Sequence, residues 1–171
     1  MTNAEFWILI IGLVCYGIYR FEKSINEEYK EKKAWIDDIE RRYPQTLEKH
    51  EKELEERRKI YADNVRRGVA QYILDCGRKL VEDAEERVFR TKAKIAVLEY
   101  APPDIKQAYR TFMWCLANCS TPNINHDNRI KKMNSNEEIF MNWYREWLAE
   151  QESEEGKREQ AKKESYNSSQ L

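Results

Sequence analysis

The first apolar stretch of the chain lies near its N-terminus. The 14 residues from Phe6 to Tyr19 carry no charge, and within residues 4–21 the charged residues are Glu5 and Arg20. A span of 18 residues is within the roughly 17 to 25 residues that cross a bilayer core of about 30 Å. Aromatic side chains at its C-terminal end suit a membrane interface. The pattern therefore predicts a single transmembrane anchor over residues 1–21.

The charges beside this segment predict its orientation. Basic residues are retained on the cytoplasmic side of a membrane, and five of them follow the segment closely while none precedes it: Arg20, Lys23, Lys30, Lys32 and Lys33. We expect the N-terminus outside and the following domain in the cytoplasm. A signal peptide and a buried core helix are the alternatives, but a signal peptide begins with a positive region, and Met1 to Glu5 contains only an acidic charge.

After the anchor, apolar residues recur at alternating steps of four and three. The stripe accepts Lys32 as a polar member and otherwise consists of Ile25, Tyr29, Ile36, Ile39 and Tyr43. This spacing is typical of the heptad seam of a coiled coil. Pro44 has no backbone donor and disfavours helical geometry at the residue before it, so the helix is expected to break or kink there.

Beyond Pro44 the sequence favours one long, charged helix. Residues 45–100 contain no proline, and their only glycines are Gly68 and Gly77. Its first part is too polar to form a core by itself, because leucine and tyrosine recur there only every seven residues. We therefore predict that residues 22–64 form a charged helical stalk that resembles a coiled coil.

The charges of this stalk are unevenly distributed. Acidic residues concentrate in 48–56 and basic residues in 57–67. One interpretation is a solvated helix that is stabilised by its own ion pairs four residues apart, such as Glu48 with Lys52. The alternative is a staggered or antiparallel partner, in which case the chain forms a homo-oligomer through the stalk.

The remaining apolar residues predict a small helical bundle over residues 65–151. The second half of the long helix gains a broader apolar face. Ala101-Pro102-Pro103 ends that helix, and the next one begins at Pro103 and ends near Ser120. The apolar residues of this third helix follow the 3.6-residue period closely, so it is expected to pack against both of its neighbours.

A capping box predicts the start of the last helix. Ser135 stands three residues before Glu138, a pattern in which the hydroxyl and the carboxylate each bond a backbone N–H group at the helix N-terminus. The helix should run from Asn136 to about Gln151. The polar residues 152–171 have almost nothing to bury and are expected to form a disordered tail.

Composition supports an all-α fold and argues against nucleic acid. Charged residues make up 36% of the chain, with only 5 glycines and 4 prolines, a mixture typical of long helices. The 30 Lys and Arg residues are balanced by 31 Asp and Glu residues. The chain therefore lacks the excess positive charge that binding to a phosphate backbone requires.

Few residues are suited to catalysis, and no motif indicates a cofactor. The chain has two histidines, His50 and His126, and neither belongs to a metalloprotease or phosphate-binding motif. The best cluster is Cys115, Cys119 and His126, two thiols one helical turn apart with an imidazole beyond them, a geometry that zinc accepts. Cysteine is also a common buried residue, and core packing is the favoured interpretation.

An aromatic stripe in the last helix is the main candidate for partner binding. Trp143, Tyr144 and Trp147 recur at helical spacing and would form a stacking surface or line a peptide groove. Aromatic residues at this spacing more often belong to a core. Both interpretations stay open at the level of sequence.

These features favour a non-enzymatic, membrane-anchored interaction or scaffold protein, such as an accessory subunit of a membrane complex. An alternative places the helical domain outside the cytoplasm as an envelope-spanning rod. That arrangement is similar in layout, though not in any motif, to the inner-membrane component of a phage spanin. An enzyme is the third class, and it would depend on the two cysteines and His126.

Overall fold

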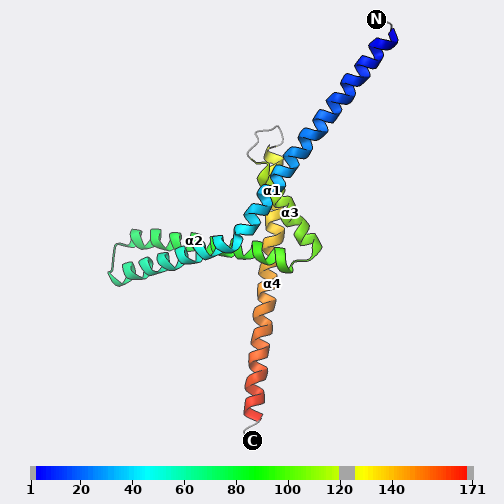
Figure 1. The fold of residues 1–171 in the computed structure, drawn as a ribbon. Coiled ribbons are helices and arrows are strands. Elements are labelled where there is room, and N and C mark those ends of the chain that lie inside the picture. The colour runs from blue at the N-terminus through cyan, green and yellow to red at the C-terminus, as the bar shows by residue number, and fades with distance from the viewer. Residues whose placement is uncertain (1–2, 120–125, 169–171) are drawn as a thin grey trace. The chain divides into compact units, whose positions relative to one another are not determined.

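The computed structural model describes residues 3–119 and 126–168, and every element within these ranges is an α-helix (Figure 1). The helices are α1 (Asn3–Arg66), α2 (Gln71–Tyr100), α3 (Pro103–Ala117) and α4 (His126–Ser168). The predicted all-α class is confirmed. The chain divides into two compact units, Met1–Glu40 and Arg41–Leu171, whereas the sequence suggested boundaries near residues 21, 64 and 151.

The predicted membrane anchor is not supported. Across the described residues, no helix has an apolar stretch long enough to span a bilayer. The single-pass localisation predicted from residues 4–21, with the N-terminus outside and the domain in the cytoplasm, is therefore wrong. The uncharged run from Phe6 to Tyr19 contains 14 residues. At 1.5 Å per residue it measures about 21 Å, which is less than the roughly 30 Å of a bilayer core.

The first unit consists of the N-terminal part of α1, and this helix continues through Pro44. The predicted break at Pro44 is thus wrong as regards secondary structure. Proline nevertheless has no N–H to donate to the carbonyl four residues earlier, which belongs to Glu40. The boundary between the two units falls directly after that residue.

Helix α1 ends in a glycine turn, so residues 45–100 do not form one helix. Gly68 has φ +63°, a left-handed conformation that costs glycine nothing. Its N–H bonds the Val65 carbonyl at 3.2 Å, and the Val69 N–H bonds the Asn64 carbonyl at 3.3 Å. This pair of bonds is the Schellman motif, which satisfies the last carbonyls of a helix. The chain then turns back into α2.

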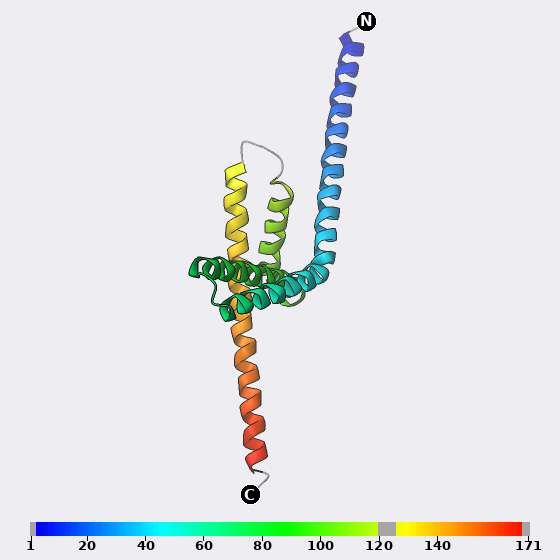
Figure 2. The same ribbon diagram turned by 90° about the vertical axis from the view of Figure 1, so that its left-hand side faces the viewer.

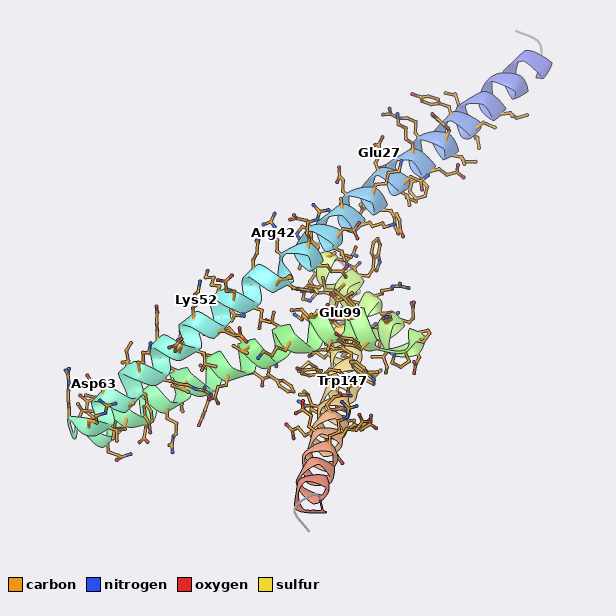
Figure 3. All side chains as sticks on the ribbon, turned by 60° about the horizontal axis from the view of Figure 1, so that its bottom comes forward. Glu27, Arg42, Lys52, Asp63, Glu99 and Trp147 are labelled. Carbon is orange, nitrogen blue, oxygen red and sulfur yellow. The ribbon has the colours of Figure 1, made fainter. Side chains whose placement is uncertain are left out.

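The C-terminal part of α1 and helix α2 form an antiparallel hairpin held by ion pairs. Figure 3 shows the segment with Lys52 and Asp63 running beside α2. Three ion pairs join the two helices: Glu51 with Lys92 at 2.8 Å, Glu53 with Arg87 at 3.0 Å and Arg58 with Glu85 at 2.6 Å. The antiparallel partner that the charge pattern of the stalk indicates is therefore α2 of the same chain.

Gly77 lets the two helices of the hairpin approach closely. A Cβ atom at this position would lie 3.1 Å from Cδ2 of Tyr61, so the Tyr61 ring occupies the space that a side chain would need. Arg57 adds a hydrogen bond from its Nη1 to the Leu80 carbonyl at 2.9 Å. Close packing of the helices at Gly77 and the Arg57 hydrogen bond thus stabilise the hairpin in addition to the ion pairs.

The core of the second unit lies where α2, α3 and α4 meet. Helix α3 begins with Pro103 at its first position, as predicted, and packs side by side with α4 (Figures 1 and 2). The largest fully buried side chains are Tyr109, Phe140, Met113 and Val97. The Phe140 ring meets Tyr109 and Phe112 edge-on, with centroids 5.6 and 5.4 Å apart. Such pairs are stabilising because the positive ring edge meets a negative ring face.

Helix α4 is longer at both ends than predicted. It begins at His126, and Ser135 lies inside it, so the predicted capping box is wrong. Contacts with the end of α3 explain the earlier start, because Arg129 Nη1 bonds the Asn118 carbonyl at 2.9 Å and Cys119 Sγ lies 3.9 Å from Met133 Sδ.

The residues predicted to form a disordered tail are largely helical, since α4 continues to Ser168. Pairs four residues apart support it there, for example Arg158 with Glu154 at 3.5 Å. Residues 120–125 of the predicted loop and residues 169–171 of the predicted tail lie outside the described residues.

Candidate protein-interaction surfaces

The two histidines have different neighbours, since His50 lies in the hairpin and His126 begins α4. The Thr91 hydroxyl donates to the Arg87 carbonyl at 2.8 Å. His50 Nδ1, 3.2 Å from Thr91 Oγ1, must then donate to that oxygen and does not take its proton. His126 lies beside Asp127, with Nδ1 and Oδ1 3.8 Å apart. The His50 contact holds the hairpin together.

The predicted metal cluster does not assemble. Within residues 3–119 and 126–168, no group of three or more His, Cys, Asp or Glu side chains is placed to hold a metal ion. Cys115 is buried in the core, and burial raises the pKa of its thiol. Cys119 contacts Met133, and His126 faces Asp127. Cys115 thus serves as a core side chain in this structure.

Lys94 is a half-buried charge that sequence reasoning missed. Its Nζ lies 5.4 Å from the ring centroid of Phe112 and 6.0 Å from that of Tyr43, within the range of a cation–π interaction. Burial lowers the pKa of Lys94; Glu137 opposes this shift and Arg90 adds to it. Lys94 thus fits core packing at the α2–α3 contact, where its ammonium rests against ring faces.

The aromatic stripe of α4 divides between core and surface. Tyr144 is buried, at 4% exposure, with its ring centroid 5.1 Å from that of Phe89, and burial raises its pKa. Trp147 stacks on Tyr100 at 5.4 Å and on Trp143 at 6.0 Å. Trp143 and Trp147 are half-buried. Tyr144 is thus part of the core. Trp143, Trp147 and Tyr100 form a partly exposed aromatic cluster beside it.

A surface groove of about 770 Å³ lies between the hairpin and α4. Its apolar part consists of Leu54, Val88, Phe89, Tyr144 and Leu148. The charged residues along it include the pairs Glu51–Lys92 and Arg58–Glu85, which already bond each other. The groove is therefore bordered by charges that satisfy one another.

Exposed apolar residues gather in the first unit. Nine large apolar residues of α1 within residues 11–29 are each at least 50% exposed, and Figure 3 shows side chains projecting on several sides of α1 near the labelled Glu27. At 3.6 residues per turn, Leu13, Tyr16 and Tyr19 lie on other sides of the helix, and the remaining six share one side: Ile11, Val14, Ile18, Phe21, Ile25 and Tyr29. We call these six residues the N-terminal apolar face.

An isoleucine recurs every seven residues along this face. Ile11, Ile18 and Ile25 follow one another at this spacing, Lys32 takes the next position and Ile39 the one after. The heptad seam recognised from the sequence began at Ile25, because the residues before it were assigned to a membrane anchor. Continuing the seven-residue spacing back to Ile18 and Ile11 would have revealed the longer repeat.

No protein family, characterised protein or solved structure matches the chain. Of the surfaces described, the N-terminal apolar face exposes the most large apolar side chains in one segment.

Proposed function

We propose that this protein is a non-enzymatic interaction or scaffold protein, and that it binds a helix of another protein molecule through the N-terminal apolar face. The observation that carries the proposal is the exposure of nine large apolar residues within residues 11–29, each by at least 50%. Contiguous apolar patches above a few hundred Å² are rare on monomeric proteins and mark contact surfaces. In this proposal the first unit binds the partner, and the second unit is a folded domain.

The shape of the first unit suits a helical partner. It is one helix, and a single helix gains most of its stability from packing against other elements. A second helix laid along its apolar face would remove this surface from water at about 25 cal/mol per Å². Folding of the first unit and binding of the partner are therefore expected to stabilise each other.

The contacts of the second unit support a structural role. His50, Cys115 and Lys94 each take part in packing contacts within the hairpin or the core. The envelope-spanning alternative depends on the same membrane segment as the predicted anchor, and no observation on the described residues favours it.

The proposal is tested by photo-crosslinking in the cells that naturally express the protein. A photoreactive phenylalanine derivative replaces Phe21, which is 67% exposed on the apolar face. The matched control replaces Tyr72, which is 71% exposed on α2. We expect a crosslink to a protein from position 21 and none of the same mass from position 72.

Two further variants show whether the face itself makes the contact. Ile18→Asp places a charge on the apolar face, and Asn26→Asp places the same charge at an exposed polar position one turn or more away. The crosslink should disappear with Ile18→Asp and persist with Asn26→Asp. Equal crosslinking from positions 21 and 72, or a crosslink that survives Ile18→Asp, contradicts the proposed function.

A further inference from the structure

We infer that the partner of the N-terminal apolar face is a second copy of this chain, paired with it as a parallel, in-register coiled coil over residues 11–32. This inference rests on the proposed function and identifies the bound protein. It also moves the site of self-association from the charged stalk, whose residues beyond Arg41 pair with α2, to the exposed start of α1.

The seven-residue repeat supplies a continuous seam. A sequence with a strict repeat of seven keeps one stripe facing a partner only if two helices supercoil around each other. Ile11, Ile18 and Ile25 stand at the first core position of successive heptads, and Val14 and Phe21 stand three residues after the first two. The three isoleucines and the two residues between them thus form one continuous apolar stripe.

The area of this seam reaches the lower bound for a specific interface. The five seam residues are 50% to 67% exposed, which corresponds to roughly 100 Å² each, about half of the area of a large apolar side chain. If the pairing covers this area fully, two helices bury roughly 1,000 Å² from the seam alone. Tyr29, four residues after Ile25, flanks the seam and adds to this area.

The charges that follow the seam favour the parallel orientation. Lys32 bonds Glu28 of its own helix, and its side chain is only 18% exposed whereas that of Glu28 is 60% exposed. Glu28 stands three residues after Ile25, so a parallel pair places Glu28 opposite Glu28 and Lys32 opposite Lys32. Each Lys32 also lies one turn from Glu28 of the other copy, and the attraction between these opposite charges offsets the repulsion of the like charges. An antiparallel pair centred on Ile18 would instead place Glu28 against the uncharged run of the other copy, where an unpaired carboxylate is costly.

Lys32 also sets the register. Polar residues at core positions, here Glu28 and Lys32, lower the stability of a coiled coil but specify one alignment of its helices. A slip of seven residues would place Lys32 of one copy beside Ile25 of the other and bury its ammonium against an apolar side chain. The in-register pair is the alignment that keeps the three isoleucine layers together.

The test uses the full chain and combines mass with a disulfide. Light scattering should give twice the 20.6 kDa of one chain. Ile25→Cys should form an intermolecular disulfide on mild oxidation, because core positions of a parallel pair face each other within the reach of an S–S bond. The matched control is Asn26→Cys, which stands on the outer face and should not crosslink. Mass spectrometry identifies which cysteines each disulfide joins, so a disulfide through position 25 or 26 is distinguished from one between native cysteines.

A charge at the seam should separate the copies. Ile18→Asp puts two like charges into the apolar seam and should raise the dissociation constant of the dimer by at least about 100-fold. Asn26→Asp adds the same charge outside the seam and should leave the constant within about two-fold, as is usual for exposed substitutions. Circular dichroism of both variants checks that the second unit remains folded.

Other results overturn the inference in distinguishable ways. A chain that is monomeric at tens of micromolar, or crosslinks only through Asn26→Cys, refutes the parallel dimer. If that monomer still gives the crosslink from position 21 to a different protein, only the second copy is refuted and the proposed function stands. If the monomer instead binds liposomes through the same face and gives no protein crosslink, both are refuted.

Discussion

Removing the Phe140 ring should destabilise the second unit strongly. Phe140 is 0% exposed and lies edge-on to Tyr109 and Phe112, with centroids 5.6 and 5.4 Å away. Replacing a buried phenylalanine by alanine costs about 3 to 5 kcal/mol, including the cavity that remains. Because two aromatic contacts are lost together, we expect Phe140→Ala to cost about 4 kcal/mol. Domains are stable by only about 5 to 15 kcal/mol.

Ile139→Ala is the matched control in the neighbouring position. Ile139 is 46% exposed, so its truncation leaves no closed cavity. Alanine also has the higher helix propensity, by up to about 0.7 kcal/mol. The free energy of unfolding of Ile139→Ala should therefore stay within about 1 kcal/mol of that of the parent chain.

Urea unfolding followed by tryptophan fluorescence measures both variants. The slope for a domain of this size is about 2 kcal/mol per molar urea, so Phe140→Ala should lower the midpoint by about 2 M. Trp143 and Trp147 on α4 report on the same contacts. If both variants shift the midpoint equally, the core does not lie at the α3–α4 contact and the described packing is incorrect.

Three further predictions concern charge, backbone and thiol chemistry. Burial lowers the pKa of Lys94 below its ordinary value of 10.5. The charged side chain therefore lowers the free energy of unfolding at every pH below the lowered pKa, and this loss of stability fades as the pH rises through that pKa. Lys94→Met should therefore raise the melting temperature at neutral pH and less so near pH 10, and a gain that grows with pH would contradict this reasoning. Gly68→Ala should cost about 1 kcal/mol in thermal unfolding, because φ is +63° there and alanine is strained in that conformation; an unchanged melting temperature would rule out the left-handed turn. Iodoacetamide should modify exposed Cys76 at least about ten times faster than Cys115, because Cys115 is buried and its thiol pKa is raised. The unfolded chain serves as the reference. Equal rates for the two cysteines in the folded chain would show that Cys115 is accessible.

Sequence patterns that involve only neighbouring residues were sufficient to predict several features of the fold. The sparse glycines and prolines predicted an all-α chain, which is what the described residues show. The start of α3 was predictable because proline at the first helical position needs no N–H donor. The uneven charges of residues 48–67 were compatible with a solvated helix or with pairing to a second copy, and they did not identify α2 of the same chain as the partner.

Other features depended on contacts between segments far apart in the sequence. A glycine within a helical pattern is compatible with both a continuous helix and a turn. The chain turns at Gly68, where the pairs Glu53–Arg87 and Arg58–Glu85 then form across the hairpin. The start of α4 was misplaced for a similar reason, because contacts of Arg129 and Met133 with the end of α3 keep the residues before Ser135 helical.

The N-terminal apolar face likewise depends partly on the order of residues and partly on tertiary contacts. Sequence alone determined that residues 6–19 are uncharged and that isoleucine recurs at positions 11, 18 and 25, because both are properties of residue order. Whether such a stretch crosses a membrane, fills a core or lies exposed depends on what surrounds it. Only the tertiary structure decided that, since it gathers the core of the second unit around Phe140 and leaves the N-terminal apolar face exposed.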